Sequence, residues 1–542
     1  MKSKIKTLLA FVLALQSLVL FSQPWPKYYG EPNKYDFSKD IVESYDKGYL
    51  MCGNIQVYSN EAEQWGWIIK TDINGEVIWD KVLENQIHLT YIRAIEKTMD
   101  GGLLVCGLVY PSIYYADPFV MKLNACGEKE WCKQFSGAYD SSPSAADIKE
   151  TETGEIILLV NEWGTSPEET MHLFKLSHEG DVLWKKPFCS GYVHPEGAIP
   201  LGHRVLITSE SDFLIAGEVY WENPWNPGGT KVLRPLFVMA DSLGNEKWVL
   251  PFGLQDTIAG ESYNVIEKTK NEFIGIASLW PTQNEIKPLF IKFDNEGASL
   301  DYQIINVKEI DTSFSEGHLG YIFLKDSSYY LSGTFEIYST EVGPVTEVII
   351  DTNLFETEPQ IVDHFIHDSL FWPYTFDTTY NQRLISNSTF KETGNWDIAL
   401  SKLNLDLEYD TLDPGNYVYD SLCSTPGLPQ SGFIFLDDCD IVTGMDVPSP
   451  EEYYAFLETI PIKAFPNPAS EGQITFEFKN TEHHKNMELR CFDIFGKVIH
   501  KEKVYRYQGE SKVSLINWQK GMYVAVVYSD GFPVGERKFV VQ

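Results

Sequence analysis

Hydrophobic and polar residues alternate in short runs that are separated by turn residues. In residues 94–107, AIEKTMDGGLLVCG, two apolar runs flank Asp100-Gly101-Gly102, and in residues 67–79, WIIKTDINGEVIW, they flank Asp72-Ile73-Asn74-Gly75. This pattern predicts β-hairpins, because Asp-Gly and Asn-Gly favour tight turns between antiparallel strands. No apolar period of 3.6 residues lies between the runs, which argues against βαβ units and α-solenoids.

Two phrases recur in alternation along the chain. The first reads GWIIKTDINGEVIWDKVL at 66–83, PFVMKLNACGEKEWCKQF at 118–135 and MHLFKLSHEGDVLWKKPF at 171–188. It keeps one spacing of lysine, glycine and tryptophan, at Lys70/Gly75/Trp79, Lys122/Gly127/Trp131 and Lys175/Gly180/Trp184, and in part at Gly244/Trp248. The second phrase begins near residues 40, 94, 147, 204, 264 and 321, with a weaker seventh copy at 371–388. A period of this length indicates a propeller or a solenoid.

Each repeat therefore contains two hairpins, which together form a four-stranded sheet. One such sheet cannot bury both faces, but seven sheets packed around an axis can. The sequence predicts an all-β chain with a seven-bladed β-propeller over residues 24–412, with six or eight blades as alternatives because the last two units are degenerate. The repeated tryptophans Trp79, Trp131, Trp184 and Trp248 are predicted to pack between neighbouring blades.

The first phrase also resembles the tryptophan-docking motif of pyrroloquinoline quinone propellers, the quinoprotein type. The resemblance covers the hairpin and does not extend to the residues that hold the quinone and its Ca²⁺ in those enzymes. It therefore implies a blade-packing motif, and we expect no cofactor, since a fold does not carry its function with it.

The N-terminal segment predicts export. Lys2, Lys4 and Lys6 precede an apolar run from Leu8 to Phe21, and Ser22 stands at a plausible cleavage point. This is the pattern of a signal peptide, residues 1–22. No later run is long enough for a membrane-spanning helix. With 43 basic and 77 acidic residues the net charge is −34, which disfavours nucleic acid as a partner.

An exported chain permits disulfides, and this one contains eight cysteines. Residues 413–459 are predicted to be a connector, in which Cys423 and Cys439 flank a Gly/Pro-rich segment and are the candidate disulfide. Cys126 and Cys132 could also bridge across a hairpin, since spacing alone does not determine pairing. Cys52 and Cys106 occupy equivalent apolar positions and are expected to be buried thiols.

Alternating strands return after residue 460 and predict a small Ig-like β-sandwich over residues 460–542. The segment resembles the type A C-terminal sorting domain of the type IX secretion system of Bacteroidota. The matching residues are Pro466, Asn467, Pro468, Asp493, Gly496, Gly521, Tyr523 and Lys538. The resemblance implies that the type IX machinery is a partner, and that the mature protein is secreted or displayed outside the outer membrane.

No familiar catalytic or metal-binding motif is present, since HExxH, GxSxG, P-loop and CxxC patterns are all missing. Asp437-Asp438-Cys439-Asp440 could touch Ca²⁺, but without EF-hand spacing it is interpreted as an acidic loop. We therefore expect no catalytic, cofactor or metal residue, and a non-catalytic protein that binds an extracellular protein or glycan through loops such as residues 220–227. The alternative is a glycan-active hydrolase or lyase, or a quinone-dependent oxidoreductase, with its site in the propeller channel.

Overall fold

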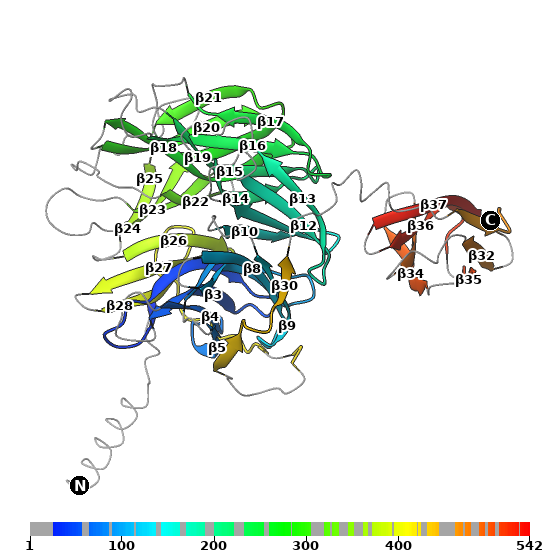
Figure 1. Ribbon diagram of the computed structural model, residues 1–542, viewed down its shortest axis with the longest axis horizontal. Helices are drawn as coiled ribbons and strands as arrows, with labels where there is room; N and C mark the ends of the chain where they lie inside the picture. The colour runs from blue at the N-terminus through cyan, green and yellow to red at the C-terminus, as the bar shows by residue number, and fades with distance from the viewer. Residues whose placement is uncertain are drawn as a thin grey trace, which may run out of the picture. The chain divides into compact units, whose positions relative to one another are not determined.

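The computed structural model describes residues 25–443 and 461–542. Within these ranges it leaves out residues 57–63, 86–88, 113–114, 137–142, 163–169, 190–199, 222–231, 254–259, 283–284, 305–318, 326–327, 335–344, 352–360, 367–370, 393–394, 420, 424–430, 470–471, 479–486, 494–496, 505–508, 517 and 530–531. All regular elements of the described residues are strands, which confirms the all-β prediction (Figure 1). None of the described segments forms an apolar helix of membrane-spanning length. The predicted signal peptide lies outside the described residues.

Sheets 1 to 3 follow the first three sequence repeats. Sheet 1 contains β2 (Phe37–Glu43), β3 (Tyr49–Gln56), β4 (Gln64–Thr71), β5 (Val77–Glu84) and, from the connector, β29 (Gly432–Phe435). Sheet 2 contains β6 (Thr90–Lys97), β7 (Leu103–Ser112), β8 (Tyr115–Leu123), β9 (Lys129–Ser136) and, also from the connector, β30 (Asp440–Thr443). Sheet 3 contains β10 (Ser144–Glu150), β11 (Ile156–Asn161), β12 (Met171–Leu176) and β13 (Val182–Phe188).

Sheets 4 to 7 continue the series. Sheet 4 contains β14 (Leu201–Ile207), β15 (Phe213–Trp221), β16 (Val232–Ala240) and β17 (Glu246–Pro251). Sheet 5 contains β18 (Gly260–Thr269), β19 (Glu272–Thr282), β20 (Glu285–Asp294) and β21 (Ser299–Ile304). Sheet 6 contains β22 (Leu319–Lys325), β23 (Ser328–Thr334), β24 (Val345–Asp351) and β25 (Ile361–Ile366). Sheet 7 contains β26 (Phe371–Thr378), β27 (Leu384–Glu392), β28 (Asn395–Leu403) and, from the N-terminal end, β1 (Lys27–Tyr29).

Sheet 7 departs from the two-hairpin repeat, because its fourth strand comes from the other end of the chain. β1 pairs antiparallel with β28, so that Lys27 faces Leu400 and Tyr29 faces Ile398. This pairing ties the first described strand to the last repeat. The inner strands β2 and β26 of sheets 1 and 7 also lie against each other, so the two ends of the repeat series meet.

The repeated phrase folds into the same turn in several sheets. The Oδ1 atom of Asp72 accepts hydrogen bonds of 2.8 Å from the backbone N–H groups of Asn74 and Glu76. Oxygen atoms of Asn124, Ser177, Asp241, Asp294 and Asn404 make the equivalent pair of bonds in their own turns. The turn closes with a left-handed residue, such as Gly75 at φ 81°, a conformation that glycine adopts without steric cost.

Apolar side chains fill the spaces between neighbouring sheets. One cluster joins sheets 1 and 2 through residues such as Ile68 and Val105, and another joins sheets 4 and 5 through Phe237 and Phe273. Two of the repeated tryptophans lie at such junctions. A Cβ atom built on Gly127 of sheet 2 would lie 3.1 Å from the Trp79 ring of sheet 1, and Trp248 of sheet 4 donates its indole N–H to the carbonyl of Asn295 at 2.9 Å.

The C-terminal region contains two further sheets. One contains β31 (Ile462–Phe465), β32 (Gln473–Phe478) and β35 (Glu510–Ser514). The other contains β34 (Val498–Val504), β33 (Met487–Phe492), β36 (Gly521–Ser529) and β37 (Phe532–Val541). Residues from both sheets, including Phe476, Leu489 and Phe539, form one buried apolar cluster.

Candidate functional site

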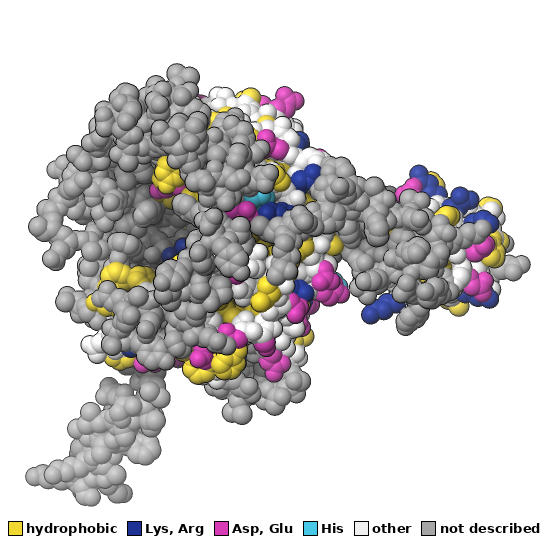
Figure 2. Space-filling model, in the orientation of Figure 1, with side chains coloured by type: hydrophobic (Ala, Val, Ile, Leu, Met, Phe, Trp, Pro, Cys, Tyr) yellow, Lys and Arg dark blue, Asp and Glu magenta, His cyan; other side chains and the backbone are white. Residues whose placement is uncertain are grey.

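The inner strands of the repeat region surround a cavity of about 320 Å³. Its lining comes from β2, β6, β10, β14, β18 and β26, and it includes the carboxylates of Asp40, Glu96, Asp147 and Asp377. The basic residues Lys97, Lys149 and Arg204 also line it. In the space-filling view, the repeat region is hollowed on the face shown, and basic side chains are visible inside the hollow (Figure 2). This cavity is the place where side chains of most of the repeats converge.

A β-bulge shapes the lining strands. The register shifts at equivalent places, for example between Ser38 and Asp40 on β2 and between Gly202 and Arg204 on β14. Similar shifts occur on β6, β18, β22 and β26. A bulge inserts one extra residue and re-aims the side chains around it. The residue after the bulge, such as Asp40, Arg204 or Asn264, then lines the cavity.

Arg204 joins two carboxylates from other sheets. Its Nη1 atom lies 3.0 Å from Oδ1 of Asp147 and 3.3 Å from Oδ2 of Asp40. Burial alone would lower the pKa of Arg204, but the attraction of Asp40 and Asp147 outweighs it and raises that pKa above its usual range. Sheets 1, 3 and 4 are thus linked by one charged group at the cavity.

The same two carboxylates also bind backbone groups. Oδ2 of Asp40 accepts the N–H of Ile95 at 3.1 Å, and Oδ2 of Asp147 accepts the N–H of Val205 at 2.8 Å. In each case the carboxylate belongs to one sheet and the N–H to the next. Hydrogen bonds to an ionised acceptor are stronger than hydrogen bonds between neutral groups. These contacts therefore hold the inner strands of neighbouring sheets together.

Lys149 makes a further link between sheets. Its Nζ atom lies 2.8 Å from Oε2 of Glu96 and 3.8 Å from Oδ1 of Asp147. Burial raises the pKa of Glu96, although the nearby Lys149 opposes that rise. Between sheets 7 and 1, Asp377 accepts the N–H of Glu43 at 3.1 Å. Each of the four carboxylates of the described lining is therefore bound to a cation, to a backbone N–H, or to both.

The repeated lysines make contacts within a sheet. Lys70 is buried and lies 2.6 Å from Asp46, in the turn of the first hairpin. Lys122 pairs in the same way with Asp100, and Lys175 lies 3.1 Å from Glu155. The repeated lysine thus joins the two hairpins of its own sheet, which is a structural task.

The connector is built into the first two sheets. β29 pairs in parallel with β5, and β30 pairs in parallel with β9. The predicted disulfide between Cys423 and Cys439 is wrong, because the structure pairs Cys126 with Cys423 and Cys132 with Cys439. The segment does not close a loop on itself, because its strands pair with the first two sheets and its cysteines bond to sheet 2. Cys52 and Cys106 are buried outside both disulfides, as expected.

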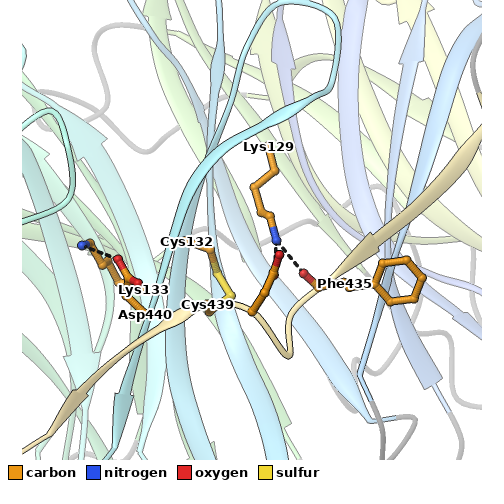
Figure 3. Close-up of a disulfide and its surroundings, with 7 residues drawn as sticks. Lys129, Cys132, Lys133, Phe435, Cys439 and Asp440 are labelled. Carbon is orange, nitrogen blue, oxygen red and sulfur yellow. Dashed lines mark hydrogen bonds and ion pairs between the residues drawn. A yellow bond between two sulfur atoms is a disulfide. The ribbon is translucent and has the colours of Figure 1, made fainter.

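The acidic loop beside the second disulfide is held by ion pairs (Figure 3). Lys129 pairs with Asp438 and also donates to the carbonyl of Phe435 at 2.7 Å. Lys133 lies 3.0 Å from Asp440. These lysines of β9 offset part of the negative charge of the loop.

In the C-terminal region, the beginning and the end of the motif series meet. Asn467 accepts the N–H of Val540 at 3.0 Å and donates to the carbonyl of Lys538 at 3.2 Å. Tyr523 stacks on Phe539 with 5.7 Å between ring centroids. Pro466 and Pro468 flank Asn467, and Gly521 begins β36. Asp493 accepts the N–H of Lys497 at 3.0 Å, while Gly496 lies outside the described residues.

Comparison with known families decides what this region is. Residues 463–542 match the family described as "Secretion system C-terminal sorting domain". Residues 463–542 are a C-terminal sorting domain. The sorting domain indicates secretion and attachment at the cell surface, and it implies interaction with the type IX secretion machinery.

The repeat region has only distant likenesses. No curated protein matches the chain. The arabinofuranosidase Arb93A of Fusarium graminearum is 9% identical with a TM-score of 0.43, covering 71% of this chain and 99% of that one. PorZ, a surface component of the type IX secretion system of Porphyromonas gingivalis, is 9% identical with a TM-score of 0.29, covering 93% and 81%. The β-propeller domain of a Pyrococcus furiosus protease is 11% identical with a TM-score of 0.38, covering 68% and 93%. Similarities this low say nothing about what this chain binds or converts.

The sequence did not single out the cavity residues. When the copies of the second phrase are aligned, Asp40, Asp147, Arg204 and Asn264 occupy the same position, and the residue type there changes from repeat to repeat. This variable position is the signal that could have pointed to them. The alignment could place these residues at one level, but the bulge that turns them inward has no sequence signature of its own.

Proposed function

We propose that this chain is an exported binding protein that acts at the cell surface without catalysing a reaction. Residues 24–412 would form a closed seven-bladed β-propeller, a rigid scaffold whose loops recognise an extracellular protein or glycan. The sorting domain, as an Ig-like sandwich, and the signal peptide 1–22 serve its delivery. No quinone or other cofactor is part of this proposal.

The observation that carries the proposal is the engagement of the cavity carboxylates. A general base or nucleophile needs an accessible lone pair and a geometry aimed at the substrate. Asp40 and Asp147 instead accept both an Arg204 guanidinium contact and a backbone N–H of the next sheet. Glu96 is bound by Lys149. These groups are placed to hold the inner strands together, and the repeated Lys70 and Lys122 are likewise bound within their sheets.

The test uses the mature protein recovered from the cell surface or the medium. It is applied to a glycan array and to immobilised surface proteins, and it is screened in parallel for hydrolase, lyase and quinone-dependent oxidoreductase activity. We expect saturable binding with no turnover. The substitutions Asp147→Asn and Glu96→Gln are expected to lower stability and to leave the affinity of the folded protein unchanged.

Turnover of any substrate by the wild-type protein would overturn the proposal. The result would be decisive if Glu96→Gln abolished that turnover in protein that still unfolds cooperatively, because Glu96 would then be acting on the substrate. Asp406→Asn, at an exposed position of a repeat turn, is the matched control for removal of a carboxylate.

A further inference from the structure

A second group of titratable side chains lies where sheets 4 and 5 meet. One nitrogen of His203 and one carboxylate oxygen each of Glu218 and Glu261 all lie within 4.8 Å of one another. His203 is on β14, Glu218 on β15 and Glu261 on β18. The His203 Nε2 atom lies 3.0 Å from Oε2 of Glu218. Among the described residues, this is the group whose ligand atoms are close enough to share one ion.

Bulges and buried hydrogen bonds set this geometry. His203 is the extra residue of the bulge on β14, and Tyr263 is the extra residue of the bulge on β18. On one side, Asn161 of sheet 3 exchanges two hydrogen bonds with the backbone of Gly202, at 2.8 and 2.9 Å. On the other side, the hydroxyl of Ser262 bonds to the N–H of Gly217 at 2.9 Å. The residues next to each ligand are therefore fixed before any ion binds, which is the condition for a preorganised site.

The two carboxylates of the group have few basic partners nearby. In the described part of the chain, neither Glu218 nor Glu261 pairs with a lysine or an arginine, and His203 is the one basic partner. Arg204 follows His203 directly, but it binds Asp40 and Asp147. A divalent cation between the two carboxylates would offset their charge.

We propose that His203, Glu218 and Glu261 bind one divalent transition-metal ion, of the class of Zn²⁺, Mn²⁺ or Fe²⁺. An imidazole with two carboxylates suits these ions, whereas Ca²⁺ and Mg²⁺ favour oxygen ligands throughout. Three protein ligands leave at least one coordination position for water or for a ligand of the protein. The site goes beyond the proposed function, which requires no metal, and it replaces the sequence-based expectation that no metal is bound.

Tyr263 acts as the supporting residue of this site. Its hydroxyl donates to the carboxylate of Glu261. Its ring stacks on the His203 imidazole with 6.1 Å between centroids and 29° between planes. Partners of this kind orient metal ligands, and their loss costs about 10- to 100-fold in metal affinity. The Tyr263→Phe variant keeps the ring and removes only the hydroxyl.

The test titrates the metal-stripped mature protein, full chain, with Zn²⁺, Mn²⁺ and Co²⁺ by calorimetry, and records the visible spectrum with Co²⁺. We expect one equivalent of metal to bind per chain. The Co²⁺ complex should show a visible absorption band typical of imidazole and carboxylate ligands, and bound metal should raise the unfolding temperature. Glu261→Gln and His203→Asn should each weaken binding at least tenfold, and Tyr263→Phe by about tenfold. His178→Asn, at an exposed histidine paired with Glu179, should change nothing.

The proposal is overturned if the wild-type protein binds no equivalent of these ions, a result that needs no variant and no assumption about folding. It is also overturned if Glu261→Gln and His203→Asn bind as the wild type does. Loss of metal binding together with intact recognition of the extracellular ligand would support the site and leave the proposed function standing. Because the two readouts are separate, failure of one does not decide the other.

Discussion

Replacing the buried repeat lysine Lys70 by methionine should destabilise the repeat region strongly. The Nζ atom of Lys70 lies 2.6 Å from Oδ1 of Asp46, and both side chains are 1% exposed. The same oxygen accepts the hydroxyl of Ser44 at 2.8 Å and the N–H of Gly48 at 3.2 Å. Without the ammonium group, Asp46 is left as an uncompensated charge in the interior. Breaking a buried ion pair in this way costs about 3–5 kcal/mol.

The expected cost depends on burial, so an exposed pair supplies the control. Lys247 lies 2.8 Å from Asp212, with side chains 41% and 19% exposed. Pairs in such positions contribute about 0–1 kcal/mol. Lys247→Met should therefore shift the denaturation midpoint little, while Lys70→Met shifts it clearly at an unchanged slope.

Sheet 4 indicates how the loss can be repaired. Met239 occupies the position equivalent to Lys70 and is 1% exposed. Glu210, equivalent to Asp46, there pairs with Lys270 instead, in an exposed contact. The double variant Lys70→Met/Asp46→Asn removes the buried charge but keeps the turn acceptor, and it should recover most of the lost stability. Equal costs for Lys70→Met and Lys247→Met, or no recovery in the double variant, would refute this reasoning.

Three further predictions concern pH, the disulfides and export. Burial raises the pKa of Asp36 to about 7, above its value in the unfolded chain. The free energy of unfolding is therefore highest at low pH and falls as the pH rises through 7. Asp36→Asn should remove up to about 4 kcal/mol of that fall, measured by denaturation at several pH values. Asp406→Asn, at an exposed position, is the matched control for removal of a carboxylate. Cys439→Ser should lower the free energy of unfolding by about 3 kcal/mol. While the Cys126–Cys423 disulfide remains, the lost bond closes only the short ring that runs from Cys126 to Cys132 and from Cys423 to Cys439. A cost equal to that of losing both disulfides would contradict this. Deleting residues 463–542 should leave the protein in the periplasm, which cell fractionation would show. Normal appearance of the truncated protein at the surface would exclude a sorting role.

The fold was largely predictable because its information is local. The turn that begins at Asp72 or Asn124 is specified within five residues by side-chain acceptors, and alternation defines the strands on either side. The sorting domain was predictable for a different reason, because its motif residues follow the order of a known family along the chain. Two of them, Asn467 and Lys538, come together in the fold.

The connector was not predictable in this way. Its strands β29 and β30 pair with the edge strands β5 and β9, which lie far earlier in the chain. The disulfide between Cys132 and Cys439 likewise joins residues 307 positions apart. Four residues of a strand have too little pattern to reveal their partner. Pairing between cysteines depends on the distance between Cα atoms, here 4.8 Å for Cys132 and Cys439, and no spacing along the chain encodes it.

The candidate sites lie where the repeat stops repeating. Bulges occur on the inner strands β2, β6, β14, β18, β22 and β26, and the residues at and after them differ among the sheets. In one part of this column, Asp40, Asp147 and Arg204 balance one another and link the sheets. One residue earlier on β14, His203 joins Glu218 and Glu261, two carboxylates that have no lysine or arginine partner among the described residues. A repeat must keep its packing residues, so recognition or metal binding can develop only at positions that packing leaves open. Asp40, Asp147 and Arg204 have such a structural role, whereas His203 does not, so substitutions at Asp147 and at His203 should separate stability from metal binding.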